Sequence, residues 1–120
     1  MPATFTVSDD GTYLIETFIG DHTAEMFRVT AEKLLEQMQQ TGILKVLVDA
    51  RAQRAPLPTL DVYNLWEELA PRMPVGAKLA VLVTWEMKGI TFGETLAVNR
   101  RVNVRNFTDQ DAALAWLRGR

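Results

Sequence analysis

Cysteine is absent from the 120-residue sequence, and serine and histidine occur once each. Without thiols the chain can form neither disulfides nor thiolate metal sites, and its natural location is a reducing compartment such as the cytoplasm. Ser8 stands beside an expected turn, and His22 precedes an expected helix, where we interpret it as an exposed residue. A Ser-His-acid triad therefore lacks a suitable pair, and one histidine cannot supply a transition-metal site. We expect a protein that is not an enzyme and that uses neither a metal nor another cofactor.

Long hydrophobic runs are absent as well. The longest unbroken apolar run extends from Leu79 to Val83, far below the roughly 20 residues that a membrane span needs. The N-terminal residues lack the basic start and the apolar core of a signal peptide. These features predict a soluble, cytoplasmic protein.

Neither sign of charge is in excess, because 15 acidic and 13 basic residues give a net charge of -2. Such a balance does not attract polyanions to the whole chain. Arg100, Arg101 and Arg105 form one basic cluster, but arginines near a helix end usually form a solvated face. No aromatic residue is interleaved with them to stack on bases. We expect no nucleic-acid partner.

In the first half of the chain, the spacing of the apolar residues changes from the pattern of β-strands to that of a helix. Two β-rich runs surround Asp10-Gly11, which is a strong signal for a hairpin. A helical pattern then extends from Thr23 to Gly42, and another begins at Thr59. The runs "ILKVLVD" (43–49) and "KLAVLVT" (78–84) hardly alternate, as expected of strands that are covered on both faces of a parallel sheet.

The second half continues the same alternation. Residues from about 91 to 102 are read as a helix, "VRNF" as a short strand, and the last residues as a closing helix with Thr108 as its N-cap. The order ββαβαβαβα predicts a single α/β domain over 1–120. Its sheet is mostly parallel, with antiparallel pairing confined to the N-terminal hairpin.

Asp49 occupies the most suggestive place of any carboxylate, at the carboxyl end of a central strand. Ligands of open α/β sheets bind at this edge. Alternatively, Asp49 accepts hydrogen bonds from backbone amides of the loop that follows it. A phosphate cradle is not expected in this loop, because no glycine lies between Ile43 and Val75 and Pro56 and Pro58 each lack a backbone donor.

Three stretches carry a resemblance to a known family: "KVLVDARAQRAPLPTLDVYNLWEEL", "AKLAVLV" and "FGETLAVNRRVNVRNFTDQDAALAWL". Together they resemble the bacterial SpoIIAA-like proteins, which are related in fold to STAS domains and anti-sigma-factor antagonists. The resemblance covers nearly the whole chain. It implies a non-enzymatic regulatory domain that docks to another protein, such as a regulatory kinase-like or anti-sigma-like protein.

In the better-studied antagonists, phosphorylation of a serine at the start of the helix after the central strand controls docking. Thr59 falls close to that position, so the resemblance makes it a candidate phosphoacceptor. The surrounding residues differ, because Leu57-Pro58-Thr59-Leu60 stands where those antagonists carry Asp-Ser-Ser-Gly. On physical grounds Thr59 is also a good helix N-cap. If it were phosphorylated, Arg51 or Arg54 could supply the counter-charge. We expect docking at the loop and helix start that contain Asp49, Arg51, Arg54 and Thr59.

A second function of another class rests on large apolar side chains. Trp85, Met87, Ile90 and Phe92 follow the second central strand, at the same end of the sheet as the Asp49 loop. Facing Leu57, Tyr63 and Trp66, they could form a pocket for an apolar small molecule or lipid, or a flap that touches a membrane surface peripherally. The simpler interpretation is that they close the core. Apolar residues on more than one side of the expected helix at 91–102 also make a homodimer plausible.

Overall fold

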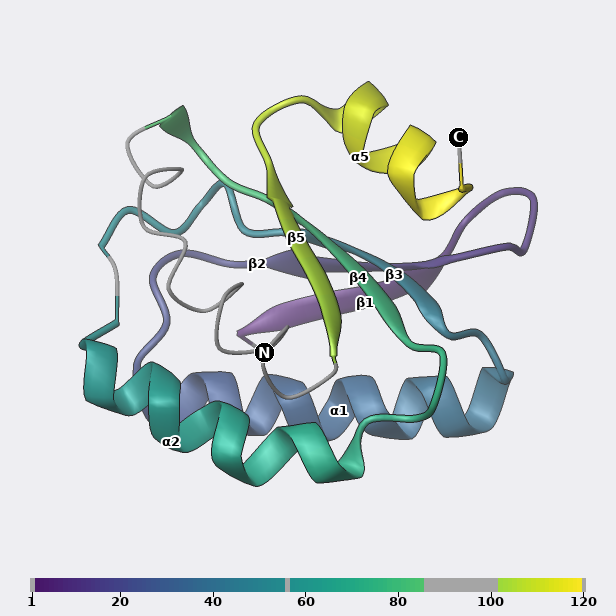
Figure 1. Cartoon of the computed structure of the whole chain (residues 1–120). Helices are drawn as coiled ribbons and strands as arrows, with labels where there is room; N and C mark the ends of the chain where they lie inside the picture. Colours follow the sequence, from purple (N-terminus) through teal and green to yellow (C-terminus); the bar gives the residue numbers. More distant parts are fainter. Residues whose placement is uncertain (1, 56, 86–101, 120) are drawn as a thin grey trace.

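The computed structural model describes residues 2–55, 57–85 and 102–119. Within them, five strands form one sheet in the order β1-β2-β3-β4-β5 (Figure 1). The strands are β1 (Ala3–Val7), β2 (Leu14–Phe18), β3 (Lys45–Asp49), β4 (Lys78–Leu82) and β5 (Asn103–Phe107). The helices are α1 (Ala24–Thr41), α2 (Thr59–Leu69), which continues into the short 3-10 helix η1 (Ala70–Arg72), and α5 (Gln110–Leu117).

The pairing of the strands confirms the expected α/β fold. β1 and β2 form an antiparallel hairpin, and every later neighbour in the sheet is parallel. The hairpin turns at Gly11, whose φ of 74° lies in the left-handed region that glycine adopts without steric cost.

The sheet is covered on both faces. α1 and α2 lie against one face, and α5 lies against the other (Figure 1). Along β3, Val46 and Val48 pack into the core beneath α1 and α2, whereas Leu47 packs into a second core beneath α5. Burial on both faces explains why this strand is apolar at successive positions.

The helix α1 has a defined start and stop. Thr23 Oγ1 accepts a hydrogen bond from the Met26 amide at 3.2 Å, and Gly42 ends the helix in the left-handed conformation with φ 72°. Leu34 and Met38 are buried against the sheet. The expected helix from Thr23 to Gly42 is therefore confirmed.

The other two helix starts differ from the sequence prediction. Pro58, not Thr59, is the N-cap of α2, because its φ of -54° and ψ of 144° already supply the extended geometry of that position and leave Thr59 as the first helical residue. In α5 the N-cap is Asp109, whose carboxylate accepts from the Ala112 amide at 3.1 Å, in place of Thr108. Asp is at least as good a cap as Thr, and local spacing does not decide between two adjacent capping residues.

The expected helix at 91–102 lies, apart from its last residue, outside the described residues, as do Arg100 and Arg101. Arg105 lies in β5, where its guanidinium stacks over the Phe107 ring at 5.5 Å from the centroid.

Candidate functional site

The carboxyl ends of β2, β3 and β4 meet at one edge of the sheet, because these strands are parallel (Figure 1). Three segments follow them: residues 19–23 before α1, residues 50–58 before α2, and residues 83–85 after β4. We call this region the carboxyl edge. It is the place where open α/β sheets bind ligands. It contains Arg51, Arg54 and Trp85, it follows directly on Asp49 at the end of β3, and Thr59 begins the helix α2 that leaves it.

Asp49 is half-buried at the end of β3 and is already engaged. Its Oδ1 accepts from the Arg51 amide at 3.1 Å and from Arg51 Nε at 2.9 Å, while Oδ2 accepts from Arg51 Nη2 at 2.8 Å. The Arg51 side-chain bond, more than any other contact, lowers the pKa of the Asp49 carboxyl. The expected acceptance of a loop amide is therefore confirmed, and the arginine fork adds a bidentate pair.

Asp21 anchors the loop that follows β3, although the sequence does not single it out. Its Oδ1 accepts from the backbone amide of Arg54 at 2.5 Å and from that of Ala55 at 3.2 Å. These two backbone bonds lower the pKa of the Asp21 carboxyl. The interaction joins loops more than 30 residues apart, which local sequence patterns do not report.

Gln53 forms a second anchor beneath the first. Its side chain is buried, accepts from the His22 amide at 2.7 Å through Oε1, and donates to the Ala55 carbonyl at 2.6 Å through Nε2. The residues 50–58 are thus tied to the β2–α1 loop by two side chains. A loop held in this way presents its outer surface in one conformation.

His22 is buried, so the interpretation of this residue as exposed is wrong. Its ring stacks on Phe18 with centroids 4.2 Å apart and meets the edge of Phe27 at 5.1 Å. Desolvation lowers the pKa of the imidazole. The aromatic ring at the end of β2 provides a surface on which imidazole packs as an apolar group, and nothing in the residues adjacent to His22 indicates this.

Large apolar side chains are exposed at the carboxyl edge. On α2, Leu60 is 67% exposed and Tyr63 is 42% exposed, and Trp85 after β4 is 75% exposed. Trp66 differs, because it packs against the core between the sheet and the helices α1 and α2. Met87, Ile90 and Phe92 lie outside the described residues.

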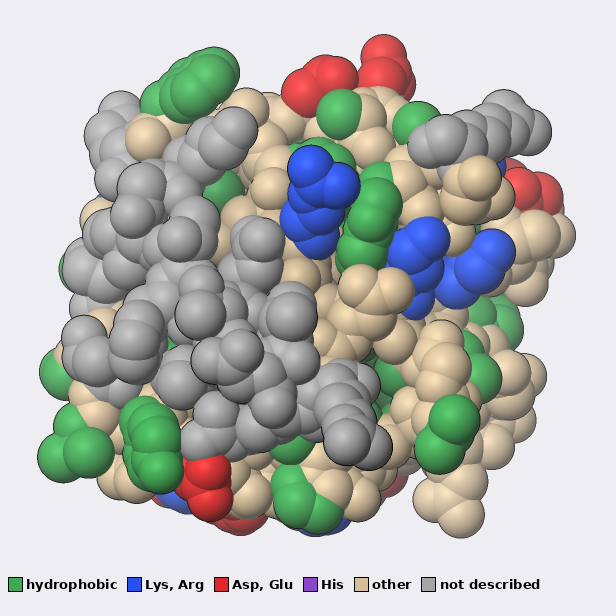
Figure 2. Space-filling view, viewed as in Figure 1, with side chains coloured by type: hydrophobic (Ala, Val, Ile, Leu, Met, Phe, Trp, Pro, Cys, Tyr) green, Lys and Arg blue, Asp and Glu red, His purple; other side chains and the backbone are tan. Residues whose placement is uncertain are grey.

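A basic cluster lies over the sheet, away from these loops. Figure 2 shows Lys and Arg side chains gathered on the face in view. The strand register places Lys45 opposite Lys78 on the neighbouring strand, and Arg105 follows on β5. Lys78 donates to the Trp116 carbonyl, and its ammonium lies over the Trp116 ring at 4.5 Å. In this cluster Lys78 therefore fastens α5 to the sheet.

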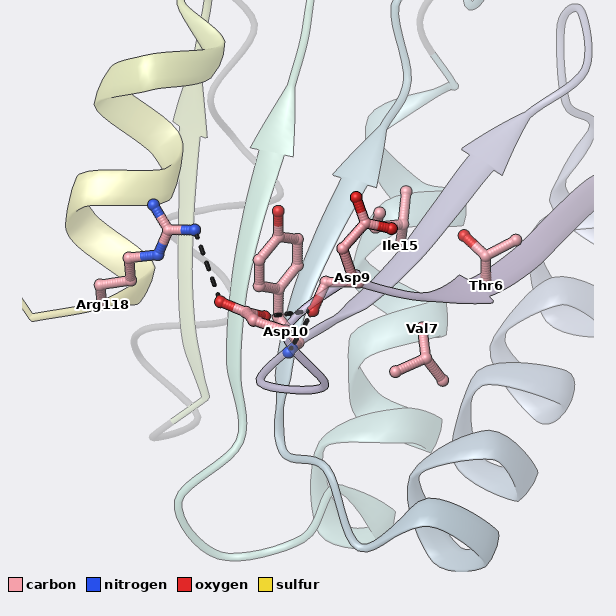
Figure 3. Close-up of a pocket in the computed structure, with 8 residues that line it drawn as sticks. Thr6, Val7, Asp9, Asp10, Ile15 and Arg118 are labelled. Carbon is pink, nitrogen blue, oxygen red and sulfur yellow. Dashed lines mark hydrogen bonds and ion pairs between the residues drawn. The ribbon is translucent and has the colours of Figure 1, made fainter.

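A shallow hollow lies at the opposite end of β2, beside the hairpin turn (Figure 3). Asp10 accepts from Ser8 Oγ at 2.8 Å and Thr12 Oγ1 at 2.7 Å, and Arg118 lies 3.8 Å from it. The bonds from Thr12 and then Ser8 lower the pKa of Asp10 to about 2. Ser8 is thus engaged in the turn, at the far end of β2 from His22, and the two residues do not form a catalytic pair.

Two further features bear on function. No group of three or more His, Cys, Asp or Glu side chains in the described part of the chain is arranged to hold a metal ion. Among the same residues, no helix combines the length and the apolar character that crossing a membrane requires.

Comparison with known proteins identifies the fold. No protein-family model matches the chain, and no curated protein matches it. A crystal structure from Shewanella loihica PV-4 superposes on it with a TM-score of 0.59 at 22% sequence identity, covering 96% of this chain and 91% of the other. That protein is described as an uncharacterized member of the DUF3478 family with a SpoIIAA-like fold.

The chain has a SpoIIAA-like fold. This confirms the expectation drawn from the strand and helix motifs. The SpoIIAA-like fold places Asp49, Arg51, Arg54 and Thr59 along the loop and helix start at the carboxyl edge. Tyr63 and Trp66 follow on the first turns of α2.

Proposed function

We propose that this SpoIIAA-like domain is a non-enzymatic binding domain that docks a protein partner through a surface formed by residues 49–63. We call it the docking surface. The observation that carries the proposal is the exposure of Leu60 and Tyr63 directly beside a loop that is held in place by Asp21 and Gln53. Residues three apart on a helix lie on the same side, so the two apolar side chains form one patch.

The charges around the patch support recognition of a protein. Arg51 is paired with Asp49, yet its side chain remains about half exposed, so it can contribute a polar rim. Because the loop is already ordered by its two anchors, docking would require little further loss of conformational entropy. This favours a binding surface, since the carboxylates of Asp21 and Asp49 already accept hydrogen bonds from amides of the loop.

The resemblance to anti-sigma-factor antagonists suggests the class of partner, a regulatory kinase-like or anti-sigma-like protein. Phosphorylation of Thr59 stays a prediction. A phosphate at the first helical residue would lie at the positive end of the helix dipole. Arg51, whose guanidinium is paired with Asp49, or Arg54 would supply its counter-charge.

The docking proposal is tested by partner capture with two matched variants. Val75 is 97% exposed and lies in the loop before β4, at the edge of the sheet opposite the docking surface. Protein carrying Leu60→Ser and Tyr63→Ser, and protein carrying Val75→Ser, would each be immobilised and incubated with lysate of the native host. Quantitative mass spectrometry should find a partner whose recovery falls at least about tenfold with the first variant, as loss of a central apolar anchor predicts, and stays unchanged with the second.

One alternative function has its own support. Trp85 is largely exposed at the carboxyl edge, which favours binding of an apolar small molecule or lipid, or peripheral contact of the domain with a membrane. Native mass spectrometry of gently extracted wild-type protein separates the two functions. Two results together would replace the docking proposal with this one: a co-purified lipid whose occupancy falls in Trp85→Ala, and partner recovery that does not change when Leu60 and Tyr63 are replaced.

A further inference from the structure

The hollow beside the hairpin turn has a floor formed by the sheet. α5 packs over β3, β4 and β5, and the hairpin of β1 and β2 continues the sheet beyond β3. Ile15 is paired with Leu47, which packs beneath α5, and Thr6 is paired with Ile15. Paired residues of neighbouring strands point to the same side of a sheet, as does a residue two positions away, such as Tyr13. Thr6, Tyr13 and Ile15 therefore line the hollow on the side of the sheet that carries α5.

The hollow has the size of a small-molecule site. Its volume is about 460 Å³, and ligand pockets commonly measure roughly 300 to 1,000 Å³. The hairpin turn contributes Asp9 and Asp10 to its rim, and the end of α5 contributes Arg118. Figure 3 shows Arg118 on one side of Asp10 and Asp9 on the other. A cation and an anion thus line the same hollow at separate places.

The guanidinium of Arg118 is held in place without being saturated with hydrogen bonds. It lies over the Tyr13 ring at 5.8 Å from the centroid, and its Nη2 is 3.8 Å from Asp10 Oδ2. The second separation exceeds the roughly 2.7 to 3.2 Å of a hydrogen bond. Within the part of the chain that the structure describes, this guanidinium donates no hydrogen bond. Its planar fork can therefore receive a carboxylate through two parallel bonds.

The two aspartates of the turn differ in their contacts. Asp10 Oδ1 accepts from Ser8 Oγ, from the Thr12 amide and from Thr12 Oγ1, so this carboxylate is fixed beside Arg118. Asp9 is exposed, and among the described residues its carboxylate has no hydrogen-bond or ion-pair partner. Asp10 therefore positions Arg118, whereas Asp9 can receive a cationic group.

We propose that this hollow binds a small zwitterion, a molecule that carries one carboxylate and one ammonium group. The carboxylate pairs with Arg118, the ammonium pairs with Asp9, and the aliphatic part lies over Ile15. The charges of the hollow select this class of ligand. A phosphate dianion would meet two carboxylates and one guanidinium, and a ligand with an ammonium alone would leave Arg118 without a partner. The site is independent of the docking surface, because it lies at the opposite end of β2.

Three zwitterions of increasing length test the ligand class. Glycine, 4-aminobutyrate and 6-aminohexanoate place the two charges at different separations, and each is compared with the carboxylate and the alkylammonium ion of the same chain length. The ¹⁵N-labelled chain is titrated at constant ionic strength and followed by NMR. The amides of Asp9, Gly11 and Tyr13 should shift saturably with at least one zwitterion, with a Kd of about 1 to 10 mM, as expected for so few ligand atoms. Each single-charge analogue of that zwitterion should bind at least about fivefold more weakly.

Two variants remove the proposed partners one at a time. Arg118→Gln removes the partner of the carboxylate and Asp9→Asn removes the partner of the ammonium, so each should weaken binding of the zwitterion at least about tenfold. Arg105→Gln, at an exposed arginine of β5 outside the hollow, should keep the wild-type affinity. Circular dichroism should show that all three variants are folded.

Three results would overturn the proposal. The first is a wild-type chain whose amides respond to none of the three zwitterions at about 100 mM, well above the expected Kd. The second is a carboxylate analogue that binds as tightly as its zwitterion, because Asp9 would then have no part in binding. The third is an affinity that does not change in Arg118→Gln, since the zwitterion would then bind at another place.

Discussion

Glu16 is a charged residue in the middle of an apolar core. It lies in β2 between Leu14 and Phe18 on the same face of the sheet and is only 3% exposed. Its partners across the two neighbouring strands are Phe5 and Val48, neither of which can neutralise a carboxylate. Desolvation alone raises the pKa of Glu16 to about 8 from an ordinary value of 4.5. The folded protein therefore holds this carboxyl protonated at pH values where the unfolded chain has lost the proton.

The free energy of unfolding should consequently fall as the pH rises. Between about pH 4.5 and about pH 8 the folded state binds one more proton at Glu16 than the unfolded state, so the slope is negative and reaches at most about 1.4 kcal/mol per pH unit. Glu16→Gln keeps the shape of the side chain and removes the ionisation. Urea unfolding at several pH values should show this decline in the wild type and a clearly flatter profile in Glu16→Gln.

An exposed glutamate provides the control for this measurement. Glu36→Gln, on the outer side of α1, should keep the pH profile of the wild type. An equally steep decline in Glu16→Gln would show that another group is responsible. The alternation of "LIETF" already places Glu16 on the face of Leu14 and Phe18, so sequence reasoning could have found this residue.

The loop at 50–58 is ordered by a residue from another element. Asp21 accepts hydrogen bonds from two backbone amides of this loop. Because its pKa is lowered, the carboxylate stays ionised at pH values below the ordinary pKa of Asp. The stabilising effect of this ionised anchor is therefore present above the ordinary pKa of Asp and is lost as the pH falls through the lower folded value. The order of the docking surface should depend on this one side chain.

Asp21→Ala should release the loop without unfolding the domain. Amide hydrogen exchange of Arg54 and Ala55 should become faster, because both amides lose their acceptor. Asp21→Asn retains an acceptor oxygen and should give an intermediate rate. Asp9→Ala, a change at an exposed aspartate of the hairpin turn, should leave both rates as in the wild type. Unchanged exchange in Asp21→Ala would mean that Gln53 alone holds the loop.

Elements whose signals are local were predicted well, and elements that depend on distant contacts were not. The hairpin at Asp10-Gly11, the helix α1 with its Gly42 stop and the acceptance of a loop amide by Asp49 all follow from residues close in sequence. The role of Gln53 depends on a contact between loops about 30 residues apart, and the burial of His22 depends on how the chain brings its ring against Phe18 and Phe27. The N-caps of α2 and α5 were each misplaced by one residue, because neighbouring residues there can both serve as the cap.

At the scale of the whole molecule, one sheet separates two cores. Leu34 belongs to the core beneath α1 and α2, and Leu117 to the core beneath α5. Alternate residues of β3 and β4 contribute to each, as Val46 and Leu47 do, so the two cores share these two strands. The two cores should therefore unfold together in one cooperative transition.

Truncation of either core should lower the stability of the whole domain. Leu34→Ala and Leu117→Ala should each cost about 2 to 4 kcal/mol, since both side chains are buried. Leu60→Ala, at an exposed position, should stay within about 0.5 kcal/mol of the wild type. Each value is obtained from urea unfolding followed by far-ultraviolet circular dichroism.

Two tryptophans distinguish a shared transition from separate ones. Trp66 packs against the core beneath α1 and α2, and Trp116 packs against the core beneath α5. Variants that retain only one of them, with the other tryptophans replaced by phenylalanine, should therefore report the two cores separately through fluorescence. Because β3 and β4 are common to both, Leu117→Ala should shift the Trp66 transition as far as the Trp116 transition. A Trp66 signal that keeps its midpoint while the Trp116 signal moves would show that α5 and its core unfold on their own, and the chain would then not behave as a single cooperative domain.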